Sequence, residues 1–165
     1  MTGLLSAETC SLAAAALEAA RKSGRKIVTA ESCTGGLIMG ALTSVAGSSS
    51  VAERGYVVYS NDAKREALGV PDETIRTHGA VSEPTAAAMA QGALERSHAQ
   101  IAISVTGIAG PGASGPKPEG MVCFGVADER GVRTETVQYG ALGRAEVREA
   151  TVVHALKLLA EAARA

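Results

Sequence analysis

Aromatic residues are scarce in this 165-residue chain, which contains one Phe, three Tyr and no Trp. Proteins that bind single-stranded nucleic acid stack the bases on aromatic side chains, and this chain has almost none to offer. The formal net charge is -1, and Lys and Arg form no basic run that could follow a phosphate backbone. The composition therefore argues against a nucleic-acid partner, and it requires a core built from Ala, Val, Leu and Ile.

Long apolar runs and paired cysteines are also missing. No segment approaches the roughly 20 apolar residues that a membrane-spanning helix needs. The N-terminus shows no positively charged stretch followed by an apolar segment and a cleavage site, so we expect no secretory signal. Cys10, Cys33 and Cys123 cannot all pair, and none belongs to a CxxC motif, which suits a reducing compartment. These absences predict a cytoplasmic protein without a membrane partner.

Two familiar patterns for binding a metal or a phosphate group are absent. His78, His98 and His154 are isolated from one another and from any cysteine pair, so we expect no zinc site. The segment Gly110–Lys117 has glycines like those of a P-loop, but Pro116 stands where glycine must precede the lysine. The sequence therefore predicts neither a metal nor another cofactor.

Predicted helices and strands alternate along the chain. The helices cover residues 6–23, 36–44, 61–69, 72–78, 82–96 and 144–163. The strands cover residues 26–30, 55–59, 101–105, 121–127 and 132–139, and the last two form a hairpin. Ser6 and Ser82 are expected to cap their helices, and residues 106–120 form the longest irregular segment. We therefore predict an α/β protein: one layered α/β/α domain over residues 1–165, with a mixed, largely parallel sheet.

The segment Thr29–Gly36, Thr-Ala-Glu-Ser-Cys-Thr-Gly-Gly, is the most informative part of the chain. It places two nucleophiles and two glycines on a strand-to-helix turn, where N–H groups of the following helix can face the group under attack. Ser32 is the first candidate nucleophile, unless it only caps that helix. Cys33 is its rival, with His78 or His98 as partner, although a free cysteine is more often a small buried apolar residue.

Lys64 is the most useful partner for a serine nucleophile. With Asn61 as cap, it lies in the first turn of its helix, where the helix dipole disfavours a positive charge. Partial burial would lower its pKa further, and a neutral lysine can act as a general base toward Ser32. The alternative is an ordinary lysine in solvent. Tyr59 and Ser60 precede it, and they either bridge Lys64 and Ser32 or complete the sheet.

The loop Thr106–Pro111 follows the third predicted strand. Ligands bind beyond the carboxyl ends of strands in open α/β sheets, so this loop should border the same cleft as Ser32. Its glycines let N–H groups approach an oxyanion or a phosphate, unless the loop is only a flexible connector. Arg144 and Arg148 lie four residues apart near the start of the last helix. They suit a phosphate or carboxylate, or they pair with neighbouring glutamates in solvent.

Three groups of motifs, taken together, resemble the CinA C-terminal domain family, which includes stand-alone nicotinamide-nucleotide amidases. The first is the segment 29–36 described above. The second is Tyr-Ser-Asn-Asp-Ala-Lys over residues 59–64, with Gly-Ala-Val-Ser over 79–82. The third is Thr-Gly-Ile-Ala-Gly-Pro over residues 106–111, with Lys-Pro-Glu-Gly over 117–120. The resemblance extends from about Glu8 to about Leu159.

This resemblance implies hydrolysis of nicotinamide mononucleotide to nicotinic acid mononucleotide and ammonia, without a metal, in pyridine nucleotide salvage. Ser32 would be the nucleophile and Lys64 its partner, with Tyr59 alongside. The substrate-binding positions would be Thr34, Gly35, Gly36, Thr106, Gly107, Gly110 and Arg144. In this hypothesis N–H groups around residues 34–36 or in the loop 106–110 stabilise the oxyanion, and Arg144 holds the phosphate.

Two further expectations concern partners. The Ala-rich first and last helices offer flat apolar faces, and similar proteins are often homodimers, so we expect a homodimer. The only other expected partner is a small-molecule nucleotide substrate. The alternative to an amidase is a non-catalytic nucleotide-binding regulatory module, which would need the glycine loops and Arg144 but no neutral lysine beside a serine.

Overall fold

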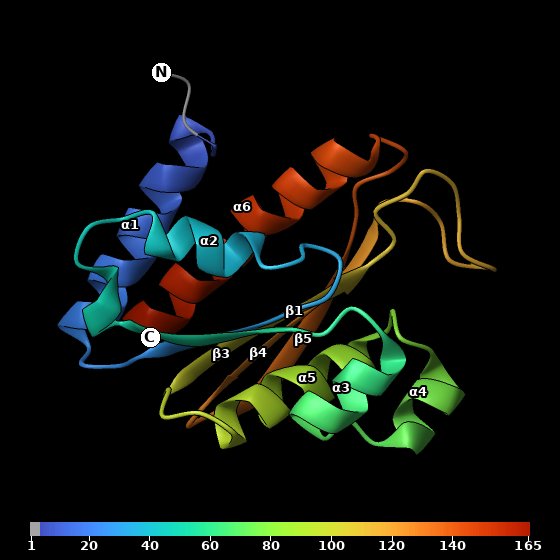
Figure 1. The fold of residues 1–165 in the computed structure, drawn as a ribbon, viewed down its shortest axis with the longest axis horizontal. Coiled ribbons are helices and arrows are strands. Elements are labelled where there is room, and N and C mark those ends of the chain that lie inside the picture. Colours follow the sequence, from blue (N-terminus) through green and yellow to red (C-terminus); the bar gives the residue numbers. More distant parts are fainter. Residues whose placement is uncertain (1–3) are drawn as a thin grey trace.

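A mixed five-stranded sheet forms the centre of the protein (Figure 1), seen in a computed structural model that describes residues 4–165. The strands are β1 (Ile27–Glu31), β2 (Ala52–Val57), β3 (Ile101–Gly107), β4 (Met121–Asp128) and β5 (Gly131–Gln138), in the spatial order β2-β1-β3-β4-β5. β1 pairs in parallel with β2 and β3, whereas β4 pairs antiparallel with β3 and β5. β4 alone therefore runs against the other four strands. This confirms the predicted mixed, largely parallel sheet.

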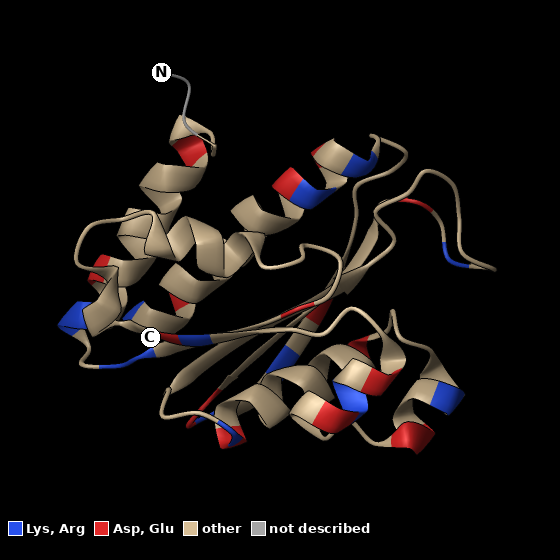
Figure 2. Cartoon of the chain, viewed as in Figure 1, with Lys and Arg blue, Asp and Glu red and all other residues tan. Residues whose placement is uncertain are grey.

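Helices cover both faces of the sheet, as predicted. One layer contains α1 (Ala7–Lys22), α2 (Leu37–Thr43) and α6 (Arg144–Arg164), and the other contains α3 (Asn61–Leu68), α4 (Asp72–His78) and α5 (Glu83–Glu95) (Figure 1). A short 3₁₀ helix, Ser48–Ser50, leads from α2 to β2. Charged residues of both signs lie mainly on the outward sides of the helices (Figure 2). No helix within residues 4–165 has the length and apolar character that crossing a bilayer requires.

Small side chains let the helices pack close to the sheet. Ile101 and Ile103 of β3 point into the core under α1, α2 and α6, whereas Ala102 between them faces α5. On that second face the Ser104 hydroxyl donates to the carbonyl of Ala86 at 2.6 Å. A core of Ala, Val, Leu and Ile, as predicted, therefore gives two thin apolar layers around the sheet.

The Ala-rich faces of α1 and α6 pack within the chain. Ala13 and Ala16 of α1 are completely buried in the same core cluster as Ala155 and Leu159 of α6. These faces are therefore not free surfaces for a second copy, and the homodimer stays a prediction that this argument no longer supports.

The predicted caps Ser6 and Ser82 are confirmed, because their hydroxyls accept from N–H groups three residues later. Two boundaries differ from the prediction. β2 covers residues 52–57 rather than 55–59, since this edge strand is half-exposed and carries polar residues that hydrophobic patterning misses. The N-cap of α3 is Ser60 rather than Asn61, because Ser60 has an extended backbone and its hydroxyl accepts from the Ala63 N–H at 3.0 Å.

Two other segments are more regular than predicted. Residues 46–51 include the 3₁₀ helix at 48–50, whose turns are closed by local backbone hydrogen bonds. β3 continues to Gly107 rather than ending at Val105, because β4 pairs with it over that extra length.

Alanine substitutions at two helical glycines should have opposite effects on the free energy of unfolding. A Cβ added at Gly92 of α5 would lie 2.0 Å from the carbonyl oxygen of Leu68, where α3 ends against α5. A Cβ added at Gly40 of α2 would meet nothing within 4 Å. Alanine is favoured over glycine in a helix interior by about 1 kcal/mol, so Gly40→Ala should raise the free energy of unfolding by up to about that amount. Gly92→Ala should lower it by about 1–3 kcal/mol, because backbone must move.

Urea unfolding of both variants measures these changes. A stabilising effect of Gly92→Ala would contradict the close approach of α3 to α5.

Candidate active site

The carboxyl ends of the parallel strands β1, β2 and β3 meet at one edge of the sheet, and a cavity of about 180 Å³ lies there. It is lined by Ser32, Cys33, Tyr59, Asn61, Lys64, Ala80, Val81, Thr106, Gly107, Ala109 and Arg144. Ligands bind at this end of open α/β sheets because loops leave neighbouring strands there in different directions. The sequence analysis predicted that the segments after β1 and β3 would share this cleft, and the structure places both in its wall.

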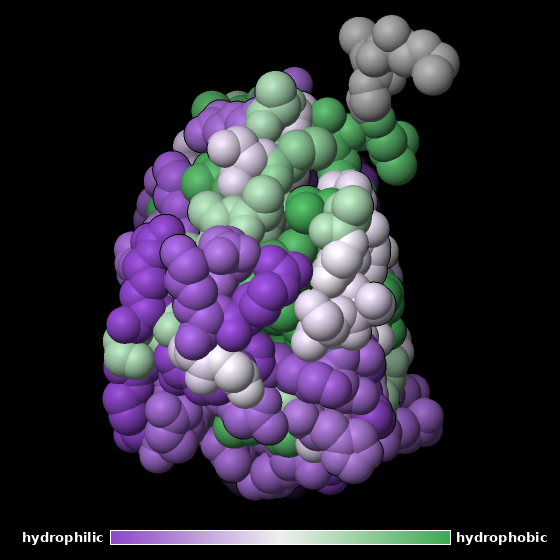
Figure 3. All heavy atoms as spheres, turned by 90° about the vertical axis from the view of Figure 1, so that its left-hand side faces the viewer, coloured by the Kyte–Doolittle hydropathy of each residue, from purple (hydrophilic) through white to green (hydrophobic). Residues whose placement is uncertain are grey.

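A larger hollow, of about 820 Å³, lies at the start of α1. Its walls are mostly apolar and include Leu5, Leu37 and Val152, and neither Ser32 nor Lys64 lines it. Figure 3 shows that apolar surface gathers toward the upper part of that side of the molecule, whereas the lower part is hydrophilic. The smaller cavity is the candidate site, because only it contains a nucleophile beside a base.

The amine of Lys64 lies against the hydroxyl of Ser32 inside the cavity. The Nζ–Oγ distance is 3.0 Å, and the two residues are 1% and 7% exposed. The same amine donates to the carbonyl oxygens of Val58 at 3.1 Å and Tyr59 at 3.3 Å. Carbonyl oxygens only accept, so two amine hydrogens point to them and the third position faces Ser32. A neutral amine presents its lone pair at that position and can accept the hydroxyl proton.

Burial lowers the pKa of Lys64, because a charged ammonium loses its hydration there, and only the nearby Cys33 opposes this. No carboxylate within residues 4–165 forms a salt bridge with Lys64, and a partner of that kind would keep it protonated. The direction of the shift therefore favours the neutral amine that a general base requires.

The pKa of the Cys33 thiol is shifted in the direction that makes the group unreactive. Burial raises its pKa to about 12, with a further contribution from the charge of Glu31, so it is a protonated thiol at neutral pH. Reactive cysteines have lowered pKa values. His78 and His98, the partners considered for Cys33, do not line the cavity. The surroundings therefore favour Ser32 over Cys33 as the nucleophile.

The turn after Ser32 is fixed from two sides. The carboxylate of Glu31 is completely buried and accepts from the Thr34 hydroxyl and from the N–H groups of Ile38 and Met39. On the other side, the Arg148 guanidinium donates to the carbonyl oxygens of Cys33 and Thr34. Sequence analysis paired Arg148 with Arg144 as an anion site, but Arg148 instead holds this turn.

Glu31 was missed as a functional residue by the sequence analysis, although a charged residue at the end of an otherwise apolar strand is a signal. Because Glu31 uses the N–H groups of Ile38 and Met39, the start of α2 is not free to face a substrate. The N–H of Gly35 is also used, since it donates to the carbonyl of Ser32 at 3.1 Å. Of the N–H groups of residues 34–36 that the sequence analysis considered as oxyanion donors, only that of Gly35 is therefore used within the turn, and those of Thr34 and Gly36 stay a prediction.

Gly107 offers another candidate donor. In the antiparallel ladder with β4, the adjacent Ile108 N–H donates to Met121, so Gly107 belongs to a pair that exchanges no hydrogen bonds. Its N–H therefore points toward β1. The carbonyl of Ser32 lies at the end of that neighbouring strand, but no hydrogen bond from the Gly107 N–H to it occurs within residues 4–165. Both oxyanion positions considered from the sequence, residues 34–36 and the loop after β3, therefore keep an N–H group that has no acceptor among residues 4–165.

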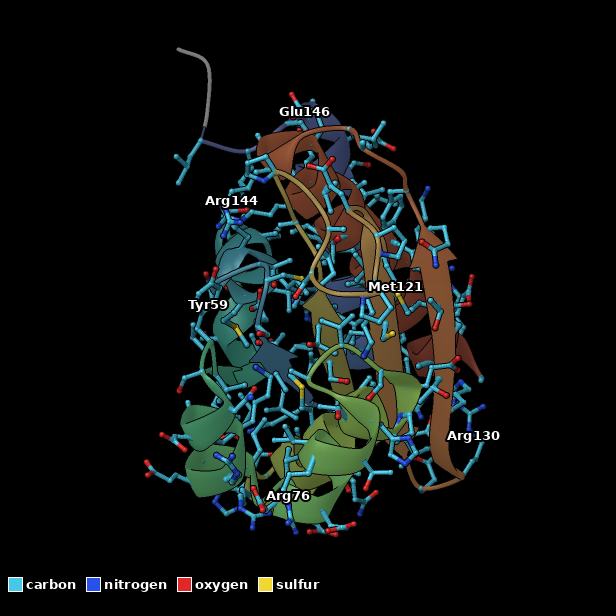
Figure 4. The ribbon with its side chains drawn as sticks, turned by 90° about the vertical axis from the view of Figure 1, so that its right-hand side faces the viewer. Tyr59, Arg76, Met121, Arg130, Arg144 and Glu146 are labelled. Atoms are coloured by element: carbon cyan, nitrogen blue, oxygen red, sulfur yellow. The ribbon has the colours of Figure 1, made fainter. Side chains whose placement is uncertain are left out.

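Arg144 and Tyr59 meet at the mouth of the cavity (Figure 4). The Arg144 guanidinium donates to the Tyr59 hydroxyl and to the carbonyl of Gly110, both at 2.8 Å. Tyr59 is 63% exposed, so this bridge lies at the protein surface. The arrangement places one cation at the edge of the cavity, and the binding of a phosphate by Arg144 stays a prediction.

Ala80 and Val81 form another part of the cavity wall. The Thr106 hydroxyl donates to the Ala80 carbonyl at 2.8 Å, and the Lys117 amine donates to the carbonyls of His78 and Val81. Thr106 thus lines the cavity while its hydroxyl holds a neighbouring segment. Sequence analysis included Ala80 and Val81 in the family motif over residues 79–82 but gave them no role, because apolar residues in a short connection carry no chemical signal.

The structure brings together most but not all of the predicted site. Ser32, Lys64, Tyr59, Thr106, Gly107 and Arg144 line the cavity. Thr34, Gly35, Gly36 and Gly110 do not line it, although Thr34 directly follows Cys33 and Gly110 directly follows Ala109, which do. Asn61, at the start of α3, is a lining residue that the sequence analysis treated only as a cap. No cluster of three or more potential metal-ligating His, Cys, Asp or Glu side chains occurs in residues 4–165.

A model of the CinA C-terminal domain family matches residues 9–163. A CinA-like protein of Chlorobium phaeobacteroides is 57% identical over 126 residues, which are 74% of this chain and 30% of that protein. A CinA-like protein of Mycolicibacterium gilvum is 53% identical over 146 residues, 87% of this chain and 34% of that protein. The chain thus spans about a third of the length of these curated relatives.

Solved structures match over the full fold. The competence/damage inducible protein CihA from Agrobacterium tumefaciens has a TM-score of 0.94 at 49% identity, covering 99% of this chain and 100% of that chain. A competence-damaged protein (CinA) superfamily protein from Escherichia coli has a TM-score of 0.85 at 30% identity, covering 96% and 94%.

The lowered pKa of Lys64 predicts a pH-dependent stability. Between that lowered pKa and the ordinary value of 10.5, the unfolded chain binds a proton that the folded chain does not, so stability rises with pH. Lys64→Met removes this effect. The gain in unfolding free energy of Lys64→Met over the natural protein should be largest near neutral pH and should shrink by up to about 1.4 kcal/mol per pH unit toward pH ~10.

Urea unfolding at several pH values measures this difference. Lys157→Met, which replaces an exposed lysine of α6, is the control and should leave the pH dependence unchanged. A constant difference between Lys64→Met and the natural protein would contradict the proposed state of the amine.

Proposed function

The chain belongs to the CinA C-terminal domain family, and we propose that it is an amidase in which Ser32 is the nucleophile and Lys64 its base. The observation that carries this proposal is the 3.0 Å contact between a buried amine and a buried hydroxyl with no carboxylate on the amine. A structural lysine gains nothing from this environment, because burial opposes its charge. A lysine that acts as a catalytic base requires such an environment, because burial lowers its pKa.

The proposed substrate is nicotinamide mononucleotide, which the family resemblance implies, in pyridine nucleotide salvage. The cavity of about 180 Å³ is smaller than the ~300–1,000 Å³ of pockets that enclose a whole ligand. It would therefore enclose the carboxamide-bearing ring and leave the sugar and phosphate at the mouth. Arg144 lies there and can bind a phosphate once its bonds to Tyr59 and Gly110 are exchanged.

In the proposed reaction Lys64 takes the proton of Ser32 as its oxygen attacks the carboxamide carbon. The N–H group of Gly107, or those of Thr34 and Gly36, would stabilise the oxyanion, and one such donor contributes about 3 kcal/mol to lowering the barrier. The C–N bond then breaks, and the protonated Lys64 gives its proton to the leaving ammonia. Water attacks the acyl-enzyme by the same route, which releases the carboxylate and restores Ser32.

The alternative, a nucleotide-binding module without catalysis, uses the cavity mouth and Arg144 but gives Lys64 no role. Nicotinamide mononucleotide binding without ammonia release would favour it.

Substitution of the three central side chains tests the chemistry. Ser32→Ala should abolish ammonia release from nicotinamide mononucleotide, and Lys64→Met should lower kcat by about 10²- to 10⁴-fold because general-base assistance is lost. Cys33→Ala should retain most activity, because its thiol takes no part. Circular dichroism confirms that each variant folds. Full turnover by Ser32→Ala or Lys64→Met would overturn the mechanism.

Arg144→Ala tests the position of the phosphate. Loss of a charged hydrogen bond should raise KM for nicotinamide mononucleotide by about 10- to 100-fold, with kcat nearly unchanged. The matched control is nicotinamide riboside, which lacks the phosphate and should show the same low efficiency with both proteins. An equal loss of catalytic efficiency with both substrates would show that Arg144 does not bind the phosphate.

A further inference from the structure

A carboxylate is enclosed directly behind the turn that carries the nucleophile. Glu31 is the last residue of β1 and precedes Ser32, and its side chain is completely buried. Its Oε1 accepts from the Thr34 hydroxyl at 2.7 Å and the Ile38 N–H at 2.8 Å. Its Oε2 accepts from the Met39 N–H at 3.0 Å and, more weakly, from the Thr29 hydroxyl at 3.2 Å. All four contacts are donors, the pattern that an ionised carboxylate takes.

These hydrogen bonds replace the side-chain cap that α2 lacks at its N-terminus. The N-cap of α2 is Gly36, which has no side chain to accept the first N–H groups of the helix. Glu31 supplies that acceptor from the neighbouring strand and also holds Thr34. The side chain of Glu31 therefore fixes the turn between β1 and α2. Ser32 lies within that turn, between Glu31 and Thr34 in the sequence.

Ser32 and Lys64 are carried by different elements. Lys64 is held by α3 and by the carbonyls of Val58 and Tyr59, so it does not follow any movement of the turn. A shift of the turn would change the 3.0 Å separation of Oγ and Nζ directly. A displacement of about 1 Å at a reacting group costs on the order of 10²-fold in rate.

Resting on the proposed function, we infer that Glu31 is a positioning residue, which sets the Ser32 hydroxyl against the Lys64 amine by holding Thr34 and the start of α2. Neither Glu31 nor Thr34 lines the cavity, so both act through Ser32. Thr34 therefore serves the nucleophile rather than the substrate.

Two threonines provide matched variants. Thr29 and Thr34 are both completely buried, and both donate a hydroxyl hydrogen bond to Glu31. Only Thr34 belongs to the turn. Thr34→Val and Thr29→Val are the same chemical change, and Thr34→Ser keeps the hydroxyl. Glu31→Gln tests the carboxylate itself, because its amide nitrogen would face donors; the threonine variants decide the question if this variant does not fold.

Two activities are measured for each variant. One is ammonia release from nicotinamide mononucleotide, giving kcat and KM. The other is the rate at which a fluorophosphonate labels Ser32, followed by mass spectrometry. In that reaction the serine oxygen forms a bond to phosphorus, fluoride leaves and Lys64 takes the proton, so it reports the Ser32–Lys64 geometry without the natural substrate. Thermal unfolding shows how much each variant is destabilised.

Thr34→Val should lower both kcat and the labelling rate by about 10-fold or more with KM unchanged. Thr34→Ser should recover most of the loss, and Thr29→Val should stay within about 2-fold of the natural protein although it is also destabilised. Equal effects of Thr34→Val and Thr29→Val would overturn the inference, as would a rise in KM alone, which would place Thr34 on the substrate.

The same experiment separates the inference from the proposed function. If the natural protein is labelled at Ser32 but releases no ammonia, the proposed substrate fails and the labelling rates of the variants decide the role of Glu31. If the natural protein is neither labelled nor active, the amidase proposal fails and the inference fails with it.

Discussion

The burial of one amine is the constraint on which the site depends. Lys64 leaves the first turn of α3 and points back to the end of the strand before it, where the carbonyls of Val58 and Tyr59 accept its hydrogens. The two carbonyl groups accept hydrogen bonds from the amine, but they do not supply the full negative charge that a buried ammonium needs for stabilisation. Parallel pairing of β1 with β2 then brings Ser32 to the remaining position of that amine. The reactive pair is thus a consequence of two adjacent strands ending at one edge.

Much of this arrangement could be predicted from the sequence, because it follows from the order of the elements. A short apolar strand, a serine-containing turn and a helix that begins after Ser60 suffice to place Ser32 and Lys64 at one sheet edge. The errors occur where burial is partial. β2 was placed three residues late because an edge strand carries polar side chains, and Asn61 was taken as the cap because Ser60 is an equally good cap one position earlier.

The direction of backbone and side-chain groups could not be predicted, since spacing fixes which face a residue occupies but not which partner it finds. Arg144 and Arg148 lie on one helix face, yet Arg144 reaches the cavity mouth while Arg148 binds the carbonyls behind Ser32. The N–H groups that start α2 suit an anion, as expected, but the anion is a side chain of the protein itself, Glu31. The N–H groups that lack an acceptor within residues 4–165 include that of Gly107 on β3, which the hydrophobic pattern could not single out.

Glu31 and Lys64 also show how two buried ionisable groups can stand on either side of one serine without forming a salt bridge. The carboxylate directs its oxygens to hydroxyls and to the start of a helix, which disperse its charge over four donors. The amine directs its hydrogens to carbonyls on the other side. Cys33 lies near both, and its thiolate would raise the pKa of Lys64, but because the pKa of Cys33 is itself raised to about 12 the thiol is protonated at neutral pH. An ion pair between Glu31 and Lys64 would stabilise the ammonium and remove the base, so the separation of the two groups favours the neutral amine.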